Sequence, residues 1–444
     1  MEKRRMLLYE KHFEASFAWT NGLFASIRES AETHLLPGEV PVRFAVTATP
    51  GVISCEMDVL TECDQPDVGR IFEFYKRKIT REEQFTAILV IPTGIGAELG
   101  GHDGDGGPAA CLLASCCDIL ITHPNVVNGS DINELPENGL YVEGSVVSRL
   151  LMGQIGLRTV RSNRVLVVLG CSKDPFFVDA AINAVNAARA TYGLSVPEII
   201  LLDREFQMVS AYAPSGRAVG RINGIEDLLD VLRTNRSKYD AVAIASAVKV
   251  NDQLRADYYS SDKKIINPWG GVEAMLTHSI SLLHDIPTAH APMCDFREHA
   301  IADSGVVDPR IAAEVISFTF LQSVLKGLQR SPGIIANPDA MYFPGVITAA
   351  DCSCLVIPDG CIGLPTLAAL LQGIPVIAVR ENRNLMRNDL AALPWSAGQL
   401  TMVENYWEAA GVLNCLRAGL APESVRRPLL KAAVKASRAR ALAF

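Results

Sequence analysis

The chain has 444 residues, of which 49% are hydrophobic and 20% are charged, and its net charge is −8 at pH 7. Because a domain holds roughly 150 residues, this length predicts two or three domains with sizeable cores. The acidic charge, without a long basic block, argues against a nucleic-acid partner.

The sequence predicts neither membrane insertion nor secretion. No apolar run reaches the roughly 18 residues that a membrane span needs, and the run within Met1–Glu10 is too short for a signal peptide. The pairs Cys116-Cys117 and Cys352-x-Cys354 lack the C-x-x-C spacing of zinc or redox sites. We therefore expect a cytoplasmic protein with reduced, buried thiols and no membrane partner.

The first 160 residues show strands alternating with helices, the pattern of an α/β protein. Residues 1–40 are predicted to be helical. The elements expected next are a strand at Phe44–Thr49, a charged helix at Phe72–Arg81, a strand at Ala87–Ile91, a glycine-rich loop at 92–107, a short helix at Ala109–Cys117 and a strand at Asp118–Thr122. We assign residues 1–160 to an N-terminal α/β domain.

The pattern restarts near Arg161. Further elements are expected as strands at Arg164–Leu169, Glu198–Leu202 and Ala241–Ala245, with helices at Phe176–Thr191 and Gly224–Arg233. Residues 161–390 are assigned to one or more further α/β domains, and 391–444 to a C-terminal helical segment. The predicted fold is two or three doubly wound, Rossmann-like, three-layer domains.

Glycines precede a helix that returns into a strand at three places in the chain. Any α/β fold repeats loop, helix and strand, but open amides at a helix N-terminus also attract anions. None of the three starts has the G-x-G-x-x-G or G-K-[ST] pattern of nucleotide sites. We therefore expect a small anionic ligand, bound by the glycines at these starts: Gly106, Gly107, Gly270, Gly271 and Gly363.

The segment with the most polar side chains is His102-Asp103-Gly-Asp105, followed by the loop after the next strand. His102 and His123 are candidates for acid–base catalysis, with Asn125 and Asn128 binding substrate. The alternative is a divalent metal on His102, Asp103, Asp105 and His123. Turn chemistry is the third interpretation, because no established metal motif is present.

A second polar cluster follows the strand near residue 290. His290 and His299 are its candidate proton-transfer residues, and Glu273 is expected to orient a substrate. His278 is expected to be a packing or surface residue within a helix. Cys361 lies just before a glycine-rich helix start, where the helix dipole would lower the pKa of a thiol. It is either a reactive nucleophile or base, or a small residue that fits a tight turn.

Most of the chain resembles one family known as a domain of unknown function, number 3326, seen mainly in cyanobacteria and algae. The resemblance rests on Pro92-Thr-Gly-Ile-Gly, Thr122-His-Pro-Asn-Val-Val-Asn, Asn267-Pro-Trp-Gly-Gly-Val-Glu-Ala and Gly373-Ile-Pro-Val-Ile-Ala-Val-Arg-Glu-Asn382. It implies no particular activity.

Residues 164–380 are also similar to the aspartate, glutamate and hydantoin racemases. Asp359-Gly-Cys361-Ile-Gly-Leu-Pro-Thr resembles the C-terminal cysteine motif of that superfamily. Its members use two cysteines across a pseudo-symmetric cleft to move a proton beside a carboxyl or carbonyl group, without a cofactor. Here Ser246 stands where the first cysteine belongs, which leaves one-cysteine chemistry, as in the related arylmalonate decarboxylases, with Ser246 as a substrate contact.

Three functions follow from these observations. The first is a cofactor-independent isomerase, racemase or lyase acting on a carboxylate-bearing metabolite, with protons handled by His102, His123, His290 or Cys361. The second is a divalent-metal hydrolase, and the third is a small-molecule-binding protein without activity. The expected partners are a small anionic substrate and, as a homo-oligomer, further copies of the chain.

Overall fold

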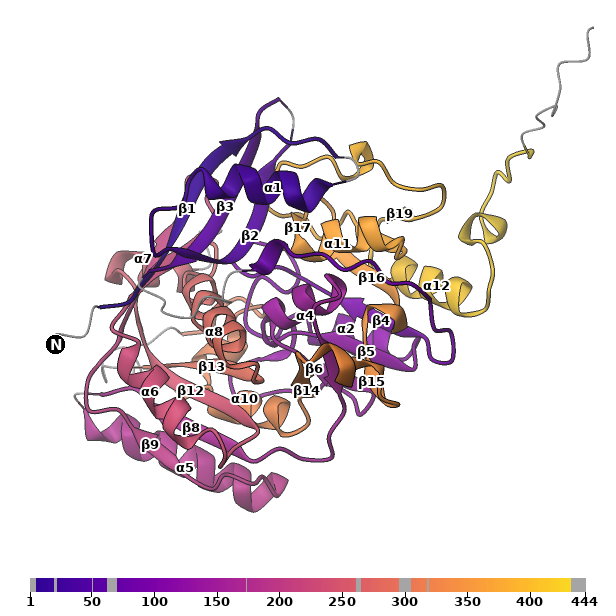
Figure 1. The fold of residues 1–444 in the computed structure, drawn as a ribbon. Helices are drawn as coiled ribbons and strands as arrows, with labels where there is room; N and C mark the ends of the chain where they lie inside the picture. Colours follow the sequence, from indigo (N-terminus) through magenta and orange to yellow (C-terminus); the bar gives the residue numbers. More distant parts are fainter. Residues whose placement is uncertain are drawn as a thin grey trace, which may run out of the picture.

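A computed structural model describes residues 5–19, 22–49, 51–61, 70–172, 174–260, 265–294, 305–317 and 319–432. The chain has an α/β fold, as predicted. The described strands form three sheets, and helices pack against them (Figure 1). In the described part of the chain, no helix is both long and apolar enough to cross a membrane.

The first sheet has six strands, and every pair of neighbouring strands in it runs parallel. Its helices are α2 (Gly107–Ala114), α4 (Gly144–Leu151), α11 (Leu364–Gln372) and α12 (Tyr406–Arg417). In sheet order its strands are β19 (Leu400–Val403), β18 (Val376–Val379), β16 (Cys352–Pro358), β4 (Thr86–Leu89), β5 (Ile119–Thr122) and β6 (Gly139–Tyr141).

The second sheet has ten strands and a parallel part made of β9 (Ile199–Leu201), β8 (Val165–Leu169), β12 (Ala241–Lys249) and β13 (Thr288–Met293). Its connecting helices are α5 (Pro175–Tyr192), α6 (Glu226–Asn235), α7 (Asp252–Tyr259) and α8 (Gly270–His284). The helix α8 lies near the centre of the molecule (Figure 1) and packs on both β13 and α4.

Beyond β12 the ten-stranded sheet continues with strands that the sequence did not predict, apart from β2. They are β10 (Gln207–Tyr212), β11 (Ala218–Asn223), β1 (Leu7–Ala15), β3 (Ile53–Leu60), β2 (Val40–Ala48) and the short β17 (Ile362–Gly363). From β10 to β17 all these neighbours are antiparallel. A third, antiparallel sheet joins β14 (Gly333–Ile335), β7 (Gly156–Arg158) and β15 (Val346–Ile347).

Two predicted helices are wrong. Within 1–40 the structure has a strand, β1, before helix α1 (Leu23–Glu32), because β1 alternates buried and exposed side chains between β3 and β11. At Phe72–Arg81 only a single turn (Arg70–Phe72) forms. The side chain of Arg77 instead donates to the carbonyls of Gln372 and Cys352, at 3.1 and 3.0 Å, which ties an irregular segment to the first sheet.

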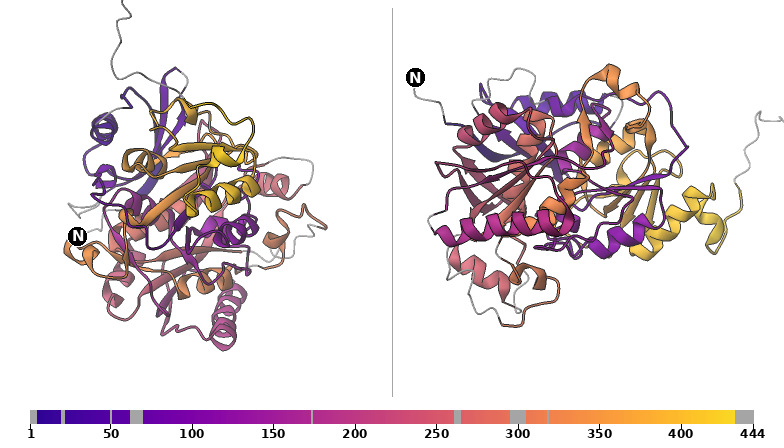
Figure 2. Two further views of the ribbon diagram at one scale, coloured as in Figure 1. Left: turned by 90° about the vertical axis from the view of Figure 1, so that its right-hand side faces the viewer. Right: turned by 90° about the horizontal axis from the view of Figure 1, so that it is seen from below.

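Hydrogen-bonded pairing connects segments that are far apart in the sequence. β16 pairs with β4, and β1 with β11, so both large sheets cross the boundary expected near 160. The pairing of β18 with β19 crosses the boundary expected near 390 in the six-stranded sheet. α12 packs beside α2, which is visible from two directions in Figure 2. Strand pairing therefore does not coincide with the division at 1–160, 161–390 and 391–444. That division stays a prediction.

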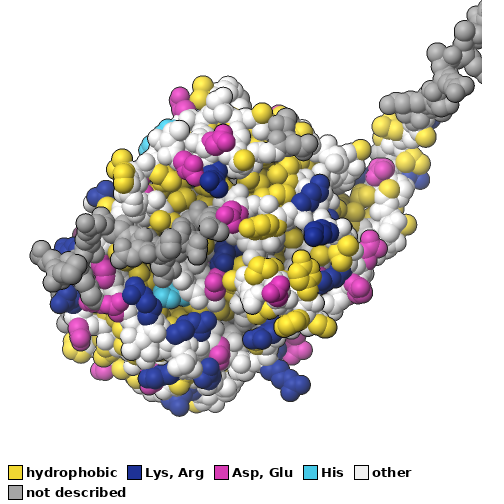
Figure 3. Space-filling view, in the orientation of Figure 1, with side chains coloured by type: hydrophobic (Ala, Val, Ile, Leu, Met, Phe, Trp, Pro, Cys, Tyr) yellow, Lys and Arg dark blue, Asp and Glu magenta, His cyan; other side chains and the backbone are white. Residues whose placement is uncertain are grey.

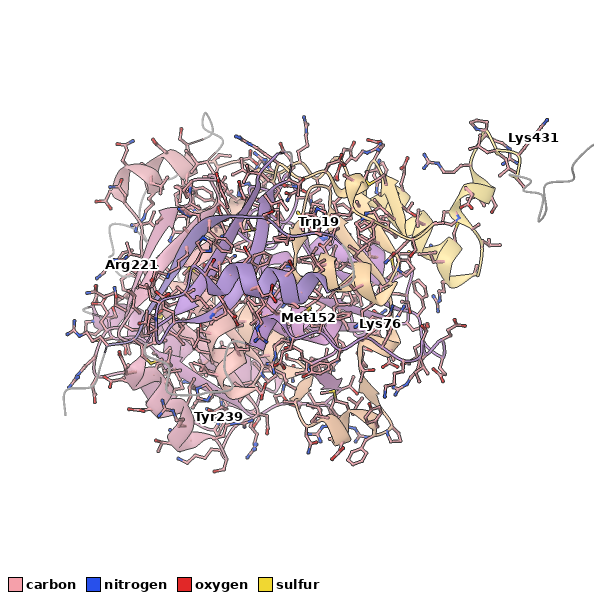
Figure 4. All side chains as sticks on the ribbon, turned by 45° about the horizontal axis from the view of Figure 1, so that its top comes forward. Trp19, Lys76, Met152, Arg221, Tyr239 and Lys431 are labelled. Atoms are coloured by element: carbon pink, nitrogen blue, oxygen red, sulfur yellow. The ribbon has the colours of Figure 1, made fainter. Side chains whose placement is uncertain are left out.

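The apolar core consists of three clusters around the two large sheets. Met152, labelled in Figure 4, is fully buried in the cluster between the six-stranded sheet and the N-terminal strands, and Tyr239 is buried in the cluster around β12. The segment after α12, which ends near Lys431, extends away from this body (Figure 4). On the face drawn in Figure 3, basic and acidic side chains of the described residues are interspersed.

Candidate functional site

A cavity of about 200 Å³ lies where the carboxyl ends of the two parallel sheets meet. Val90 follows β4, His123 follows β5, Ile357 lies near the end of β16, and Pro292 lies near the end of β13; all four line the cavity. Ligands of α/β proteins bind at this end of the strands. The volume is below the roughly 300–1,000 Å³ of pockets for drug-sized molecules, so the cavity suits a small ligand.

Several helices begin at this cavity. One face of α8 lines it with residues spaced by three or four: Gly270, Glu273, Ala274, Thr277 and, beside Thr277, His278. The first turns of α4, α11 and α10 (Leu321–Gln329) also line it. Glu143 caps α4, and Asn267 accepts the N–H groups of Trp269 and Gly270 at the start of α8. Among the described residues, no side chain caps α11. The uncapped start of α11 therefore offers free amides to a ligand.

Glu143 and His278 form one ion pair on the cavity wall, with 2.9 Å between Oε1 of Glu143 and Nε2 of His278. Burial alone raises the pKa of Glu143, but the charge and hydrogen bond of His278 and the donors of Ser145 outweigh it, so the pKa lies below its ordinary value. An ionised Glu143 accepts a hydrogen bond from Nε2–H. In the neutral form of His278, Nδ1, which is buried without a hydrogen-bond partner in the described chain, carries the lone pair.

Glu273 and His290 form a second pair, which continues to Ser246. Nδ1 of His290 lies 2.8 Å from Oε2 of Glu273, and Nε2 lies 2.8 Å from Oγ of Ser246. These are the distances of a Ser-His-Glu triad. Glu273 and His290 line the cavity, but Ser246 does not, so the carboxylate rather than the hydroxyl faces a ligand. Ser246 therefore fixes the orientation of His290.

His123 is a neutral side chain in the cavity wall. The amide N–H of Ile91 donates to Nε2 of His123 at 3.1 Å, so the ring proton belongs on Nδ1. Burial lowers the pKa of His123 to about 4. At neutral pH, His123 can donate a hydrogen bond from Nδ1 and cannot accept a proton at Nε2 without losing its bond to Ile91.

The structure brings some of the predicted site residues to the cavity and places others elsewhere. Those lining it are Asp103, His123, Asn125, Asn128, Gly270, Glu273, His290, Cys361 and Gly363. Those outside its lining are His102, Asp105, Gly106, Gly107, Ser246 and Gly271. His299 lies outside the described residues.

Two of the glycines outside the lining, Gly106 and Gly271, have packing roles instead, whereas a Cβ on Gly107 would meet nothing within 4 Å. A Cβ on Gly106 would lie 2.9 Å from the carbonyl oxygen of Val126, and one on Gly271 would lie 2.1 Å from that of Ala218. These positions need glycine because another backbone passes close by. The start of α2, with Gly106 and Gly107, therefore lies outside the lining of this cavity, and an anion bound at that start stays a prediction.

The predicted metal set does not assemble. Nδ1 of His102 is 2.9 Å from the hydroxyl of Tyr258, Asp105 accepts the amide N–H of Gly100 at 2.8 Å, and His123 accepts from Ile91. Asp103 alone of the four shares the cavity with His123. Among the described residues, no group of three or more histidine, cysteine or acidic side chains is arranged to hold a metal ion.

Cys361 lines the cavity, but it does not have the environment expected of a reactive thiol. It lies two residues before Gly363, the N-cap of α11, and burial together with the charge of Asp359 raises its pKa well above the ordinary value. The expected dipole effect fails because the thiol is buried outside the first turn.

We therefore expect limited alkylation near neutral pH to label the exposed Cys171 before Cys361. Peptide mapping after partial reaction measures the order. The substitution Cys361→Ala should leave turnover within about threefold of the unsubstituted protein, well short of the ~100-fold or greater loss typical of a positioned base. If Cys361 is labelled first, it is a reactive thiol, and the hypothesis that it acts as a nucleophile or base stands.

Sequence reasoning missed two residues with a central place in the cavity, Glu143 and His278. A signal for His278 was present, because it lies on the same helical face as Gly270, Glu273 and Thr277, whose spacing of three and four marks one side of a helix. The expectation that His278 is a packing or surface residue is replaced by its pairing with Glu143. Nothing in the local sequence indicates that Glu143 meets this helix.

Two comparisons with known proteins bear on identity. A protein of Synechococcus sp., named an uncharacterized lipoprotein, is 32% identical over 345 residues, which are 77% of this chain and 93% of that protein. No solved structure matches the chain significantly. The family described as "Protein of unknown function (DUF3326)" matches residues 86–426. The chain therefore belongs to this family, as its motifs suggested.

Proposed function

We propose that this protein is an isomerase or lyase that moves a proton on a small carboxylate-bearing metabolite with its own side chains and without a cofactor. The observation that carries the proposal is the presence of two histidine–carboxylate pairs, Glu143–His278 and Glu273–His290, on one small cavity. Removal of a proton beside a carboxyl group needs a base on one side of the ligand and an acid on the other.

The two pairs suit different tasks. In the first, Glu143 accepts the hydrogen bond from Nε2–H of His278, so the neutral imidazole carries its lone pair on Nδ1 and can accept a proton there. The electron pair of the broken C–H bond then stays on the substrate as an enolate. In the second pair, His290 and Ser246 hold Glu273 in place beside the ligand. Glu273 is suited to orient the substrate or to exchange a proton with it.

The anionic group of the substrate is expected between α11 and Arg43. Gly363 in β17 pairs with Ala45 in β2, which brings the uncapped start of α11 next to the strand that carries Arg43. Arg43 is the one lysine or arginine among the described residues of the lining. Asp58 accepts from its guanidinium at 2.5 and 3.0 Å and Glu10 accepts from Nη2 at 3.3 Å, whereas Nη1 has no partner in the described chain. A cation and free amides together favour a carboxylate.

The remaining expectations stay predictions. A metal-dependent hydrolase would need ligands that the described residues do not bring together. The Synechococcus relative is named a lipoprotein, a name that does not point to the cytoplasm. The cytoplasmic location expected for this chain stays a prediction. A homo-oligomer likewise stays a prediction.

A binding experiment tests the proposal without knowledge of the substrate. A panel of small mono- and dicarboxylates is screened for an increase in the thermal unfolding temperature. A ligand at 100 times its Kd stabilises a protein by about 2.7 kcal/mol. Ala274 lines the cavity on α8, so Ala274→Leu should fill part of the space and abolish the effect. Stabilisation that persists in Ala274→Leu would place the ligand elsewhere and contradict the proposal.

A further inference from the structure

Asp103 is a cavity residue whose carboxyl group is not used by the two histidine pairs. It lies in the glycine-rich loop before α2, and its backbone N–H donates to Oε1 of Glu314 at 3.1 Å. The carboxyl oxygens of Asp103 have no hydrogen-bond partner within the described chain, and no lysine or arginine there pairs with it. A carboxyl group in such a place is free to interact with a ligand.

Glu314 is held rigidly behind Asp103. The hydroxyl of Tyr258 donates to Oε1 of Glu314 at 2.7 Å, and Nδ2 of Asn267 lies 3.4 Å from the same oxygen. Nδ1 of His102 lies 2.9 Å from the Tyr258 hydroxyl and holds it in turn. Glu314 is buried, and no basic residue of the described chain pairs with it. A buried carboxyl group fixed by three donors cannot move away from its neighbour.

Within the described chain, the groups around Asp103 are acids, and no lysine or arginine there pairs with it. Burial raises the pKa of Asp103 well above its ordinary value, and the charges of Glu314, Glu273 and Asp105 raise it further. Burial also raises the pKa of Glu314, to about 7. The hydrogen bonds from Tyr258 and from the Asp103 amide lower this pKa but do not outweigh burial. The groups that face Asp103 are Glu314 beside α7, Glu273 on α8, Asp105 on its own loop, and Tyr258 and Tyr259 on α7.

We propose that Asp103 is the proton donor of this cavity and that Glu314 is the positioning residue that fixes the Asp103 backbone and keeps its carboxyl group protonated. The assignment rests on the proposed function and supplies its acid. After His278 takes a proton from carbon, the O–H bond of Asp103 breaks and a new bond forms between that proton and the enolate. Exchange with water then returns a proton to Asp103 and removes one from His278, so the cycle is balanced.

The test needs no substrate, so it separates this inference from the proposed function. Infrared spectroscopy records the C=O band of protonated carboxylic acids while the full-length protein is titrated with pH. The spectrum of each protein carrying Asp103→Asn is subtracted from the spectrum of the same protein with Asp103, so that the difference spectrum reports on Asp103. The difference spectrum of the otherwise unsubstituted protein should show a protonated-acid band at neutral pH.

In Glu314→Gln the amide oxygen still accepts from Tyr258, Asn267 and the Asp103 amide, so the loop stays in place while one negative charge is lost. The midpoint of the Asp103 band should fall by about one pH unit or more. Glu198→Gln, at a surface ion pair with Lys238, is the control and should leave the midpoint unchanged. The inference is overturned if the wild-type difference shows no protonated band at neutral pH, or if Glu314→Gln leaves the midpoint where it was.

Discussion

Replacing His278 by glutamine is expected to lower turnover by about two to four orders of magnitude, the range for loss of a positioned acid or base. Glutamine keeps most of the volume of the imidazole, so packing against α4 should survive. It has no group that can accept a proton near neutral pH, so the first step of the reaction stops. Initial rates of hydrogen exchange on the ligand found in the carboxylate screen give the measurement.

The helix α8 offers a matched control for this substitution. His284 lies at the end of the same helix, is partly buried as His278 is, and does not line the cavity. His284→Gln should therefore leave turnover within a few-fold of the unsubstituted protein. If His284→Gln and His278→Gln reduce turnover equally, the loss reflects damage to α8, and the role assigned to His278 is wrong.

Arg217→Ala is expected to lower the free energy of unfolding by about 3–5 kcal/mol, the range for breaking a buried ion pair. Arg217 is 2% exposed, donates to Glu56 at 2.5 Å and also pairs with Glu10. Burial lowers the pKa of Arg217 to about 9, so the guanidinium stays charged at neutral pH. Its removal takes away the ion-pair partner of the buried Glu56 and leaves Arg43, at 3.3 Å, as the remaining partner of Glu10 among the described residues.

Urea denaturation followed by circular dichroism measures this loss of stability. Arg221, which lies in β11 four residues after Arg217 and is labelled in Figure 4, is exposed and provides the control. Arg221→Ala should change the free energy of unfolding by no more than about 0.5 kcal/mol. A loss below about 1 kcal/mol for Arg217→Ala would show that the buried cluster contributes little to stability.

The sequence predicted the parallel parts of the fold much better than the antiparallel part. β8, α5, β12 and α11 follow from runs of buried apolar residues with helical or strand spacing. The sequence predicts a helix at β1 because Leu7–Ala15 mixes charged and apolar residues. The segment forms a strand because it pairs with β3 on one side and β11 on the other. Such partners, distant in sequence, are not visible in a local pattern.

The candidate site was partly predictable for a related reason. His123, His290 and Glu273 follow strand ends or begin a helix, and polar residues at those positions of α/β proteins usually face the ligand. Cys361 lies at the cavity too, but burial reverses the pKa shift that its sequence position suggested. Glu143 and Arg43 could not be found, because their roles depend on how α4 and β2 pack against α8.

Proton NMR in D2O tests most directly whether the cavity moves protons on carbon. A carboxylate that binds to the unsubstituted protein but not to Ala274→Leu is incubated with each variant, and the C–H signal beside its carboxyl group is followed. We expect this signal to disappear with the unsubstituted protein and with His284→Gln, and to persist with His278→Gln. A ligand that occupies the cavity of the unsubstituted protein and keeps all its carbon-bound protons would show that the cavity does not move protons on carbon.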